Sequence, residues 1–180
     1  KRIGHATRVA RYAEQIVKAE RGDPAIVISA AYLHDIGIKE AERKHRSTAA
    51  RYQEEEGPPI AREILERLGA RAELIEEVCD IIAHHHHPRD EETLNFKCLY
   101  DADLIVNLEE NGKENPPEPD KVSRIIEKSF LTETGKSLAR EALGAKPATA
   151  CWRVAMRAVR KFVEIDEERC DGCGLCVLSC

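Results

Sequence analysis

Apolar residues recur at intervals of three and four along most of this chain, and this helical periodicity restricts its fold more than any other feature. The first series ends at Gly22, and a core-like apolar run follows Asp23 and Pro24, a typical helix N-cap and first-turn pair. Helices are predicted at 3–21, 24–35, 47–56, 59–68, 72–84, 93–110, 120–131, 135–143 and 147–164. No alternating strand pattern longer than a few residues occurs, which indicates an all-α bundle of about seven to eight helices.

Domain organisation follows from two breaks in this pattern. Residues 111–119 combine Asn-Gly with three prolines and acidic residues, so we expect a loop between helices there. Cysteines gather at the C-terminal end of the 180-residue chain. We therefore predict a helical domain over residues 1–164 and a short, irregular, cysteine-rich tail over residues 165–180.

Charge and hydropathy limit the partners. The chain has 28 Lys and Arg against 33 Asp and Glu, a formal net charge of -5, and its basic residues are scattered among acidic ones. This distribution argues against double-stranded nucleic acid as a partner. The absence of a long apolar run predicts no membrane contact, and the first ten residues do not resemble a signal peptide, so we expect a cytoplasmic protein.

All the histidines of the chain fall in a few places that suggest one shared role. They are His5, His34, His45 and the run His84, His85, His86 and His87. A lone histidine such as His5 is more often a core residue than a ligand. The pair His34-Asp35 is different, because it follows a strongly apolar helix, where an unpaired carboxylate is costly. A bound cation would remove that cost.

Asp101 and Asp103 raise the same question within the apolar segment LNFKCLYDADLIVNL. Helical spacing places Asp103 on the same face as Phe96 and Leu99, so its side chain is predicted to point inward. For each aspartate the alternative to metal binding is an ion pair with an arginine. The residues alone do not decide between metal binding and an ion pair. Metal binding is favoured for Asp103, whereas the two interpretations are about equal for Asp101.

The series HATRVARYAE at 5–14, AAYLHDIG at 30–37, IIAHHHH at 81–87 and DADLIVNL at 101–108 resembles the HD phosphohydrolase superfamily in order and local context. The resemblance covers roughly residues 1–110, and it implies an HD-domain helical bundle. It also implies that His5, His34, Asp35 and Asp103 bind a divalent metal. Such a donor set suits manganese, iron, cobalt, nickel or zinc.

Some members of the superfamily bind a second ion. The resemblance offers His45, His85 and either His84 or His86 as its ligands, with Asp35 bridging the ions; a polar loop before Pro88 is the alternative for the histidine run. Ile38 stands where some subgroups carry a Lys or Glu that assists acid-base chemistry. Lys39 or Glu40 could replace that helper. Asn107 matches a position that nucleotide-specific relatives use for substrate, although a solvent-facing side chain is the simpler interpretation.

The tail carries a cysteine motif of its own. Cys170, Cys173, Cys176 and Cys180 have the spacing Cys-x-x-Cys-x-x-Cys-x-x-x-Cys, which resembles bacterial ferredoxins and implies a 4Fe-4S cluster. A zinc knuckle is the competing interpretation. In two-cluster ferredoxins the fourth cysteine ligates the other cluster, so we expect an intact cluster in the full-length protein and an absent or incomplete one in these 180 residues. The scattered Cys79, Cys98 and Cys151 are predicted to be buried apolar residues.

Together these features predict a metal-dependent phosphohydrolase that acts on a small phosphate ester, with a nucleotide as the favoured example, through a metal-activated water. One alternative is a two-iron redox enzyme of the same fold that receives electrons from the cysteine module or a redox partner. A second alternative is a sensor without catalytic activity, in which the metal site is structural.

Overall fold

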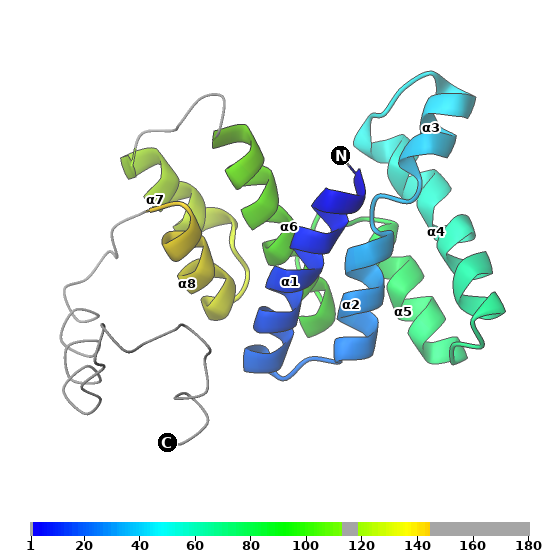
Figure 1. Ribbon diagram of the computed structural model, residues 1–180, viewed down its shortest axis with the longest axis horizontal. Helices are drawn as coiled ribbons and strands as arrows, with labels where there is room; N and C mark the ends of the chain where they lie inside the picture. Colours follow the sequence, from blue (N-terminus) through cyan, green and yellow to red (C-terminus); the bar gives the residue numbers. More distant parts are fainter. Residues whose placement is uncertain (1, 113–118, 145–180) are drawn as a thin grey trace, which may run out of the picture. The chain divides into compact units, whose positions relative to one another are not determined.

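The computed structural model describes residues 2–112 and 119–144, which form eight helices and no strand (Figure 1). The helices are α1 (Arg2–Glu20), α2 (Pro24–Leu33), α3 (Ile38–His45), α4 (Ala50–Arg67), α5 (Ala72–Ile82), α6 (Leu94–Gly112), α7 (Pro119–Ser129) and α8 (Glu133–Ala142). All of them belong to one compact unit, Lys1–Lys146. The predicted all-α class is confirmed.

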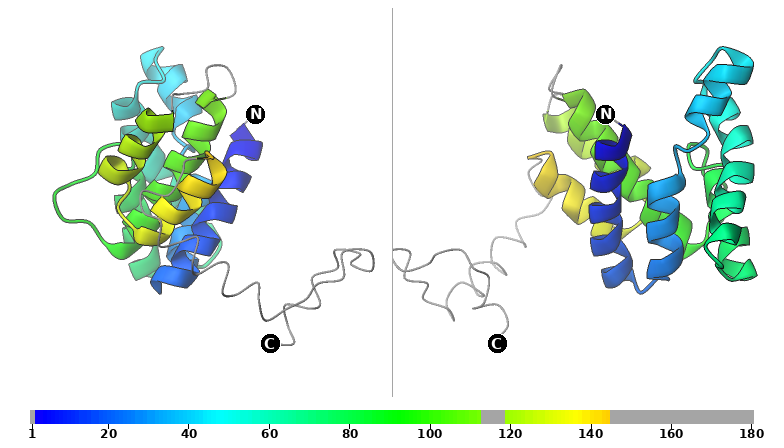
Figure 2. Two further views of the ribbon diagram at one scale, coloured as in Figure 1. Left: turned by 90° about the vertical axis from the view of Figure 1, so that its left-hand side faces the viewer. Right: turned by 45° about the vertical axis from the view of Figure 1, so that its right-hand side comes forward.

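The bundle is centred on α1, α2 and α6, which contact one another pairwise. Helix α5 packs against α2 and α4, and α3 packs on α4, whereas α8 packs on α6, α1 and α7 (Figures 1 and 2). The largest fully buried side chains, Phe96, Ile16, Ile81, Ile82, Leu99 and Ile105, come from these central helices and α5. The apolar period of the sequence therefore corresponds to the core.

The structure differs from the predicted helices at two places. No helix is predicted between residues 37 and 47, yet α3 forms there with Ala41 as its one buried residue. The helix packs on α4 through the fully buried Ala41, and Arg43 and Lys44 pair with Glu40 along its surface. Because only one of its residues is buried, the sequence shows no apolar period there.

Helix α4 is continuous where a break between residues 56 and 59 is predicted. Pro58 and Pro59 lack the N–H groups that would bond the preceding turn, which normally ends a helix. Close packing of neighbouring segments against this part of α4 offsets that loss. The approach is so close that a Cβ added to Gly57 would lie 2.7 Å from Ile82 Cγ2, and one added to Gly37 would overlap the backbone of α4.

Asp101 fixes α8 to α6. Its carboxylate is fully buried and accepts hydrogen bonds from the backbone N–H of Leu131 and Thr132, each at 2.8 Å, and from the Thr132 hydroxyl at 2.6 Å. Thr132 in turn caps α8 by accepting from Gly135 N–H, and a Cβ on Gly135 would overlap Asp101. Asp101 therefore lies neither at the metal ligands nor against an arginine, the two alternatives open from sequence.

Cys79 and Cys98 are buried free thiols, as predicted. No helix in the described part of the chain combines the length and apolar character that a bilayer crossing requires. The predicted helix over 147–164, the boundary at residue 164, Cys151 and the four tail cysteines lie outside the described residues.

Candidate metal centre

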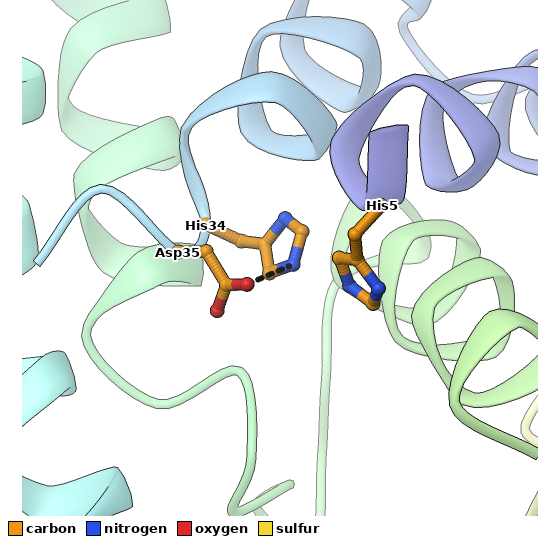
Figure 3. Close-up of side chains that lie close together, drawn as sticks. All are labelled: His5, His34 and Asp35. Atoms are coloured by element: carbon orange, nitrogen blue, oxygen red, sulfur yellow. Dashed lines mark ion pairs between the residues drawn. The ribbon is translucent and has the colours of Figure 1, made fainter. Parts of the chain in front are cut away.

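Three of the four predicted first-site ligands converge where α1, α2 and the turn after α2 meet (Figure 3). His5 comes from the start of α1, and His34 is the C-cap residue of α2 and precedes Asp35 directly. The His34 Nε2 atom lies 3.7 Å from Asp35 Oδ2, and one ligand atom from each residue lies within 4.8 Å of the others. This spacing suits a single cation in contact with all three.

Asp103 brings the fourth predicted ligand from α6. Its side chain is 12% exposed, and its Oδ1 lies 3.0 Å from His5 Nε2 and 3.5 Å from His34 Nε2. The other carboxylate oxygen, Oδ2, accepts a hydrogen bond of 2.9 Å from the Asn107 amide. Asp103 thus points inward as predicted, with Oδ1 directed at the histidines.

His5 and Asp103 each stabilise the ionised form of the other. The hydrogen bond to Asp103 raises the pKa of His5 to about 8, against the opposing effect of burial. Burial alone would raise the pKa of Asp103, but the hydrogen bond from His5 and the nearby imidazoles of His34 and His85 hold it below its ordinary value. In the absence of a metal, a proton between these residues partly balances the buried carboxylate.

Buried nitrogen atoms without partners are the clearest sign that the site is built for a ligand. The Nε2 atoms of His34, His85 and His86 are buried and have no hydrogen-bond partner within residues 2–112 and 119–144. Such atoms are rare in folded proteins because each leaves a desolvation cost uncompensated. An imidazole nitrogen lone pair is also a preferred ligand of divalent transition metals, so these residues fit such an ion.

The second group of predicted ligands is only partly assembled. Asp35, His85 and His86 have ligand atoms within 4.8 Å of one another, so Asp35 belongs to both candidate groups. The His85 ring lies 5.4 Å from that of His34, and burial together with the neighbouring His86 and His34 lowers the pKa of His85 to about 3. His85 is therefore neutral, as a metal ligand must be.

His84 has partners other than Asp35. Its Nε2 lies 3.1 Å from both carboxylate oxygens of Glu92, its Nδ1 contacts the Asp80 carbonyl, and its ring stacks on Phe96 at 4.6 Å. Within the histidine run, His84 therefore binds the loop before α6, whereas His85 and His86 lie at the candidate metal site.

His45 belongs to another cluster. Its Nε2 lies 3.0 Å from Glu56 Oε1, and its ring stacks on Tyr52 at 4.1 Å. His45, Glu55 and Glu56 lie close enough to hold an ion, but Lys44 already neutralises Glu56 at 2.6 Å. The structure does not bring His45 to Asp35.

The remaining predicted functional residues lie close to these groups in the chain. Lys39 is exposed on the first turn of α3, four residues after Asp35, while Ile38 is partly buried. Asn107 is partly buried and donates to Asp103, so its amide nitrogen is engaged in the described structure. Their roles in acid-base chemistry and substrate binding stay predictions.

Three residues that hold the side chains or backbone of the candidate site were not predicted from the sequence. Glu54 of α4 accepts from the His86 backbone N–H at 3.0 Å and contacts His87 Nδ1 at 3.0 Å, which holds the chain beside Asp35. Glu110 contacts His5 and forms an ion pair with Arg8. The available signals were helical spacings, since Arg8 is three residues after His5 and Glu110 is seven after Asp103.

Comparison with known proteins agrees with this architecture. The HD domain family model matches residues 2–127. A predicted HD superfamily hydrolase from an uncultured Thermotogales bacterium is 23% identical over 89% of this chain and 81% of that one, with a TM-score of 0.58. Bacillus subtilis YpgQ is 21% identical over 90% of this chain and 89% of its own, with a TM-score of 0.55. No curated protein matches significantly. HD domains bind divalent metals, and the family match spans α1–α6 and most of α7, so this chain belongs to the HD domain family.

Proposed function

We propose that this protein is a metal-dependent phosphohydrolase that acts on a small phosphate ester, with a nucleotide as the favoured substrate. The proposal rests chiefly on one observation: the buried Nε2 atoms of His34, His85 and His86 beside Asp35 have no hydrogen-bond partner among the described residues. A hydrogen-bonded structural core leaves few such atoms, and here three of them lie together. Membership of the HD domain family and the similarity to a predicted HD superfamily hydrolase support hydrolysis as the reaction.

The residues divide the work by their chemistry. His5, His34, Asp35 and Asp103 would hold a divalent cation, which supplies Lewis acidity toward a phosphoryl oxygen and lowers the pKa of a water molecule. Asp35 and Asp103 present carboxylate oxygens that can accept the proton of an attacking water. Asn107 orients Asp103 through Oδ2, and Lys39 could contact phosphate or the leaving group from the first turn of α3.

Metal content and phosphate release, measured on the parent and on Asp35→Asn, test the proposal. Asp35→Asn keeps the side-chain size but removes the charge shared by both candidate groups. We expect it to lose bound metal and to lower metal-dependent turnover by about 100- to 1000-fold, a typical loss when a central electrostatic group is removed. Asp80→Asn is a matched control, because Asp80 is an exposed carboxylate that pairs with Arg89.

The assay uses a panel of phosphomonoesters, phosphodiesters and nucleotides with Mn²⁺, Co²⁺, Ni²⁺, Zn²⁺ and Fe²⁺. Hydrolysis by Asp35→Asn at the parent rate would refute the assignment. Full metal occupancy in the parent with no turnover across the panel would instead favour a metal-dependent sensor.

A second candidate function is supported by the position of Asp35 in both ligand groups. An Asp35 carboxylate shared between two irons, one with His5 and His34 and the other with His85 and His86, would suit a two-iron redox enzyme. His85→Gln separates the stoichiometries, since it should reduce bound iron from two ions to one if both groups are filled. Turnover that requires oxygen or a reductant, with no phosphate released, would favour this candidate over hydrolysis.

A further inference from the structure

The histidine rings at the candidate centre are held in two different ways. His34 Nδ1 lies 2.9 Å from the Ala31 carbonyl, and His85 Nδ1 lies 2.8 Å from the Ile82 carbonyl. Each of these rings therefore donates Nδ1–H to its own backbone and keeps Nε2 for the site. In the described part of the chain His5 has no such bond to a backbone carbonyl, and its Nδ1 lies 3.4 Å from Glu110 Oε1 on α6.

Helix polarity explains the difference. His34 and His85 lie at the C-terminal ends of α2 and α5, where the last carbonyls have no partner within the helix. His5 lies at the N-terminal end of α1, where the free backbone groups are N–H donors and the carbonyls are already bonded. An acceptor for His5 Nδ1–H must therefore come from another element.

Glu110 can act in this way because α1 and α6 are tied together around it. Arg8, one turn after His5, forms an ion pair with Glu110. One turn further along α1, the Tyr12 hydroxyl donates to Glu109 at 2.7 Å. The side chains of Arg8 and Glu110 are 35% and 40% exposed, so their pairing adds little to stability, and its main effect is to aim the carboxylate.

We propose that Glu110, held by Arg8, is the positioning residue that fixes His5 with Nδ1 protonated and Nε2 directed at the metal. This inference rests on the metal site of the proposed function. A carboxylate behind a metal-bound imidazole sets its tautomer, and losing such a partner typically weakens metal binding by about 10- to 100-fold. His34 and His85 do not depend on a side chain in this way, so His5 is the ligand that Glu110 controls.

The test compares Mn²⁺ affinity, measured by electron paramagnetic resonance of the free ion, in the full chain and its variants. Glu110→Ala should weaken binding by about 10- to 100-fold. Glu110→Gln should restore much of the affinity, because its amide oxygen still accepts from Nδ1–H. Glu109→Ala is the matched control, since it removes a neighbouring carboxylate and a link between the same helices without touching His5; its affinity should equal the parent's.

Nitrogen-15 NMR of the Zn²⁺-loaded parent gives a second readout, with His5→Gln to assign the signal. We expect His5 to carry its proton on Nδ1 in the parent and to lose this fixed tautomer in Glu110→Ala. Parent-like affinity in folded Glu110→Ala overturns the inference, as does a parent His5 protonated on Nε2. If Glu110→Ala does not fold, Arg8→Met and the parent spectrum decide. A parent that binds no cation overturns the proposed function as well, whereas metal lost in Asp35→Asn but kept in Glu110→Ala overturns this inference alone.

Discussion

His5 and His85 show how neighbouring residues change the acid-base behaviour of identical side chains. The hydrogen bond to Asp103 raises the pKa of His5 to about 8, whereas burial lowers that of His85 to about 3. The same residue type is stabilised as a cation at one position and as a neutral ring at another. At the centre this difference is consistent with a site whose charge balance is completed by a bound cation.

These shifts predict a stability maximum near pH 6.5 for the protein kept metal-free with a chelator. Above pH 6.5 the unfolded chain has already lost the proton that folded His5 keeps, so the stabilisation falls as pH rises through about 8. A shift of that size corresponds to about 2 kcal/mol at most. Below pH 6.5 unfolded His85 gains a proton that the folded state excludes, so stability falls again.

Urea unfolding between pH 5 and 9 measures both limbs. His5→Gln should flatten the limb above pH 6.5, and His85→Gln should flatten the limb below it. Parent-like curvature above pH 6.5 in His5→Gln would show that the Asp103 contact does not carry this stabilisation.

At the scale of elements, buried polar contacts and glycine packing decide where helices attach. Asp101 holds the N-terminal end of α8 against α6, and Gly37 lets the turn after Asp35 approach α4 closely. Burial of apolar side chains alone is compatible with several relative positions of these helices, because it is not directional. The two contacts select one, because each has a narrow geometry.

Asp101→Ala should destabilise the fold by about 3 kcal/mol, because buried N–H groups of Leu131 and Thr132 and the Thr132 hydroxyl would lose a charged acceptor. The free energy of urea unfolding at pH 7 measures this. Asp80→Ala, which removes an exposed carboxylate paired with Arg89, should cost less than about 1 kcal/mol. Equal losses in both variants would contradict the anchoring role.

Gly37→Ala should lower the thermal midpoint and weaken Mn²⁺ binding, because the added Cβ would overlap the Gln53 carbonyl and lie 2.7 Å from Gly57 N, which forces apart α4 and the turn that carries Asp35. Overpacking of this kind costs about 1–3 kcal/mol. In Gly4→Ala the Cβ meets no atom within 4 Å, so this helical control should be neutral or slightly stabilising. Unchanged metal affinity in Gly37→Ala would show that the turn tolerates the shift.

At the scale of the whole molecule, the candidate metal centre draws its residues from α1, α2, α6 and the segment after α5. Its residues are separated by as many as 98 positions, as in the pair His5 and Asp103. An ion in contact with residues from several helices would link parts of the core that otherwise meet mainly through apolar packing. Metal binding and folding are therefore expected to be coupled.

Mn²⁺ at 100 times its dissociation constant should stabilise the native state by about 2.7 kcal/mol. For a chain of this size that corresponds to a rise in Tm of roughly 5–10 °C. Calorimetry with and without Mn²⁺ measures it, and Asp35→Asn should show no rise. Mg²⁺ serves as an ionic-strength control, since imidazole ligands suit it poorly. An equal rise in Asp35→Asn would place the stabilising ion elsewhere.

The sequence by itself determined the all-α class and the inward face of Asp103, because helical periodicity and the cost of a buried carboxylate are local properties. It also determined the His34-Asp35 pair as a candidate centre, since the adjacent apolar helix places both residues at the edge of the core. Only the tertiary structure decided that His85 and His86, but not His84 or His45, lie beside Asp35.

That choice depends on carboxylates from other elements, Glu92 for His84, Glu54 for the chain at His86 and Glu56 for His45. Continuity of α4 through two prolines and the attachment of Asp101 to α8 were likewise decided by tertiary contacts. The physical reason is the same throughout: periodicity shows which face of a helix is buried, but the partner of a buried polar atom is set by whichever segment packs against it.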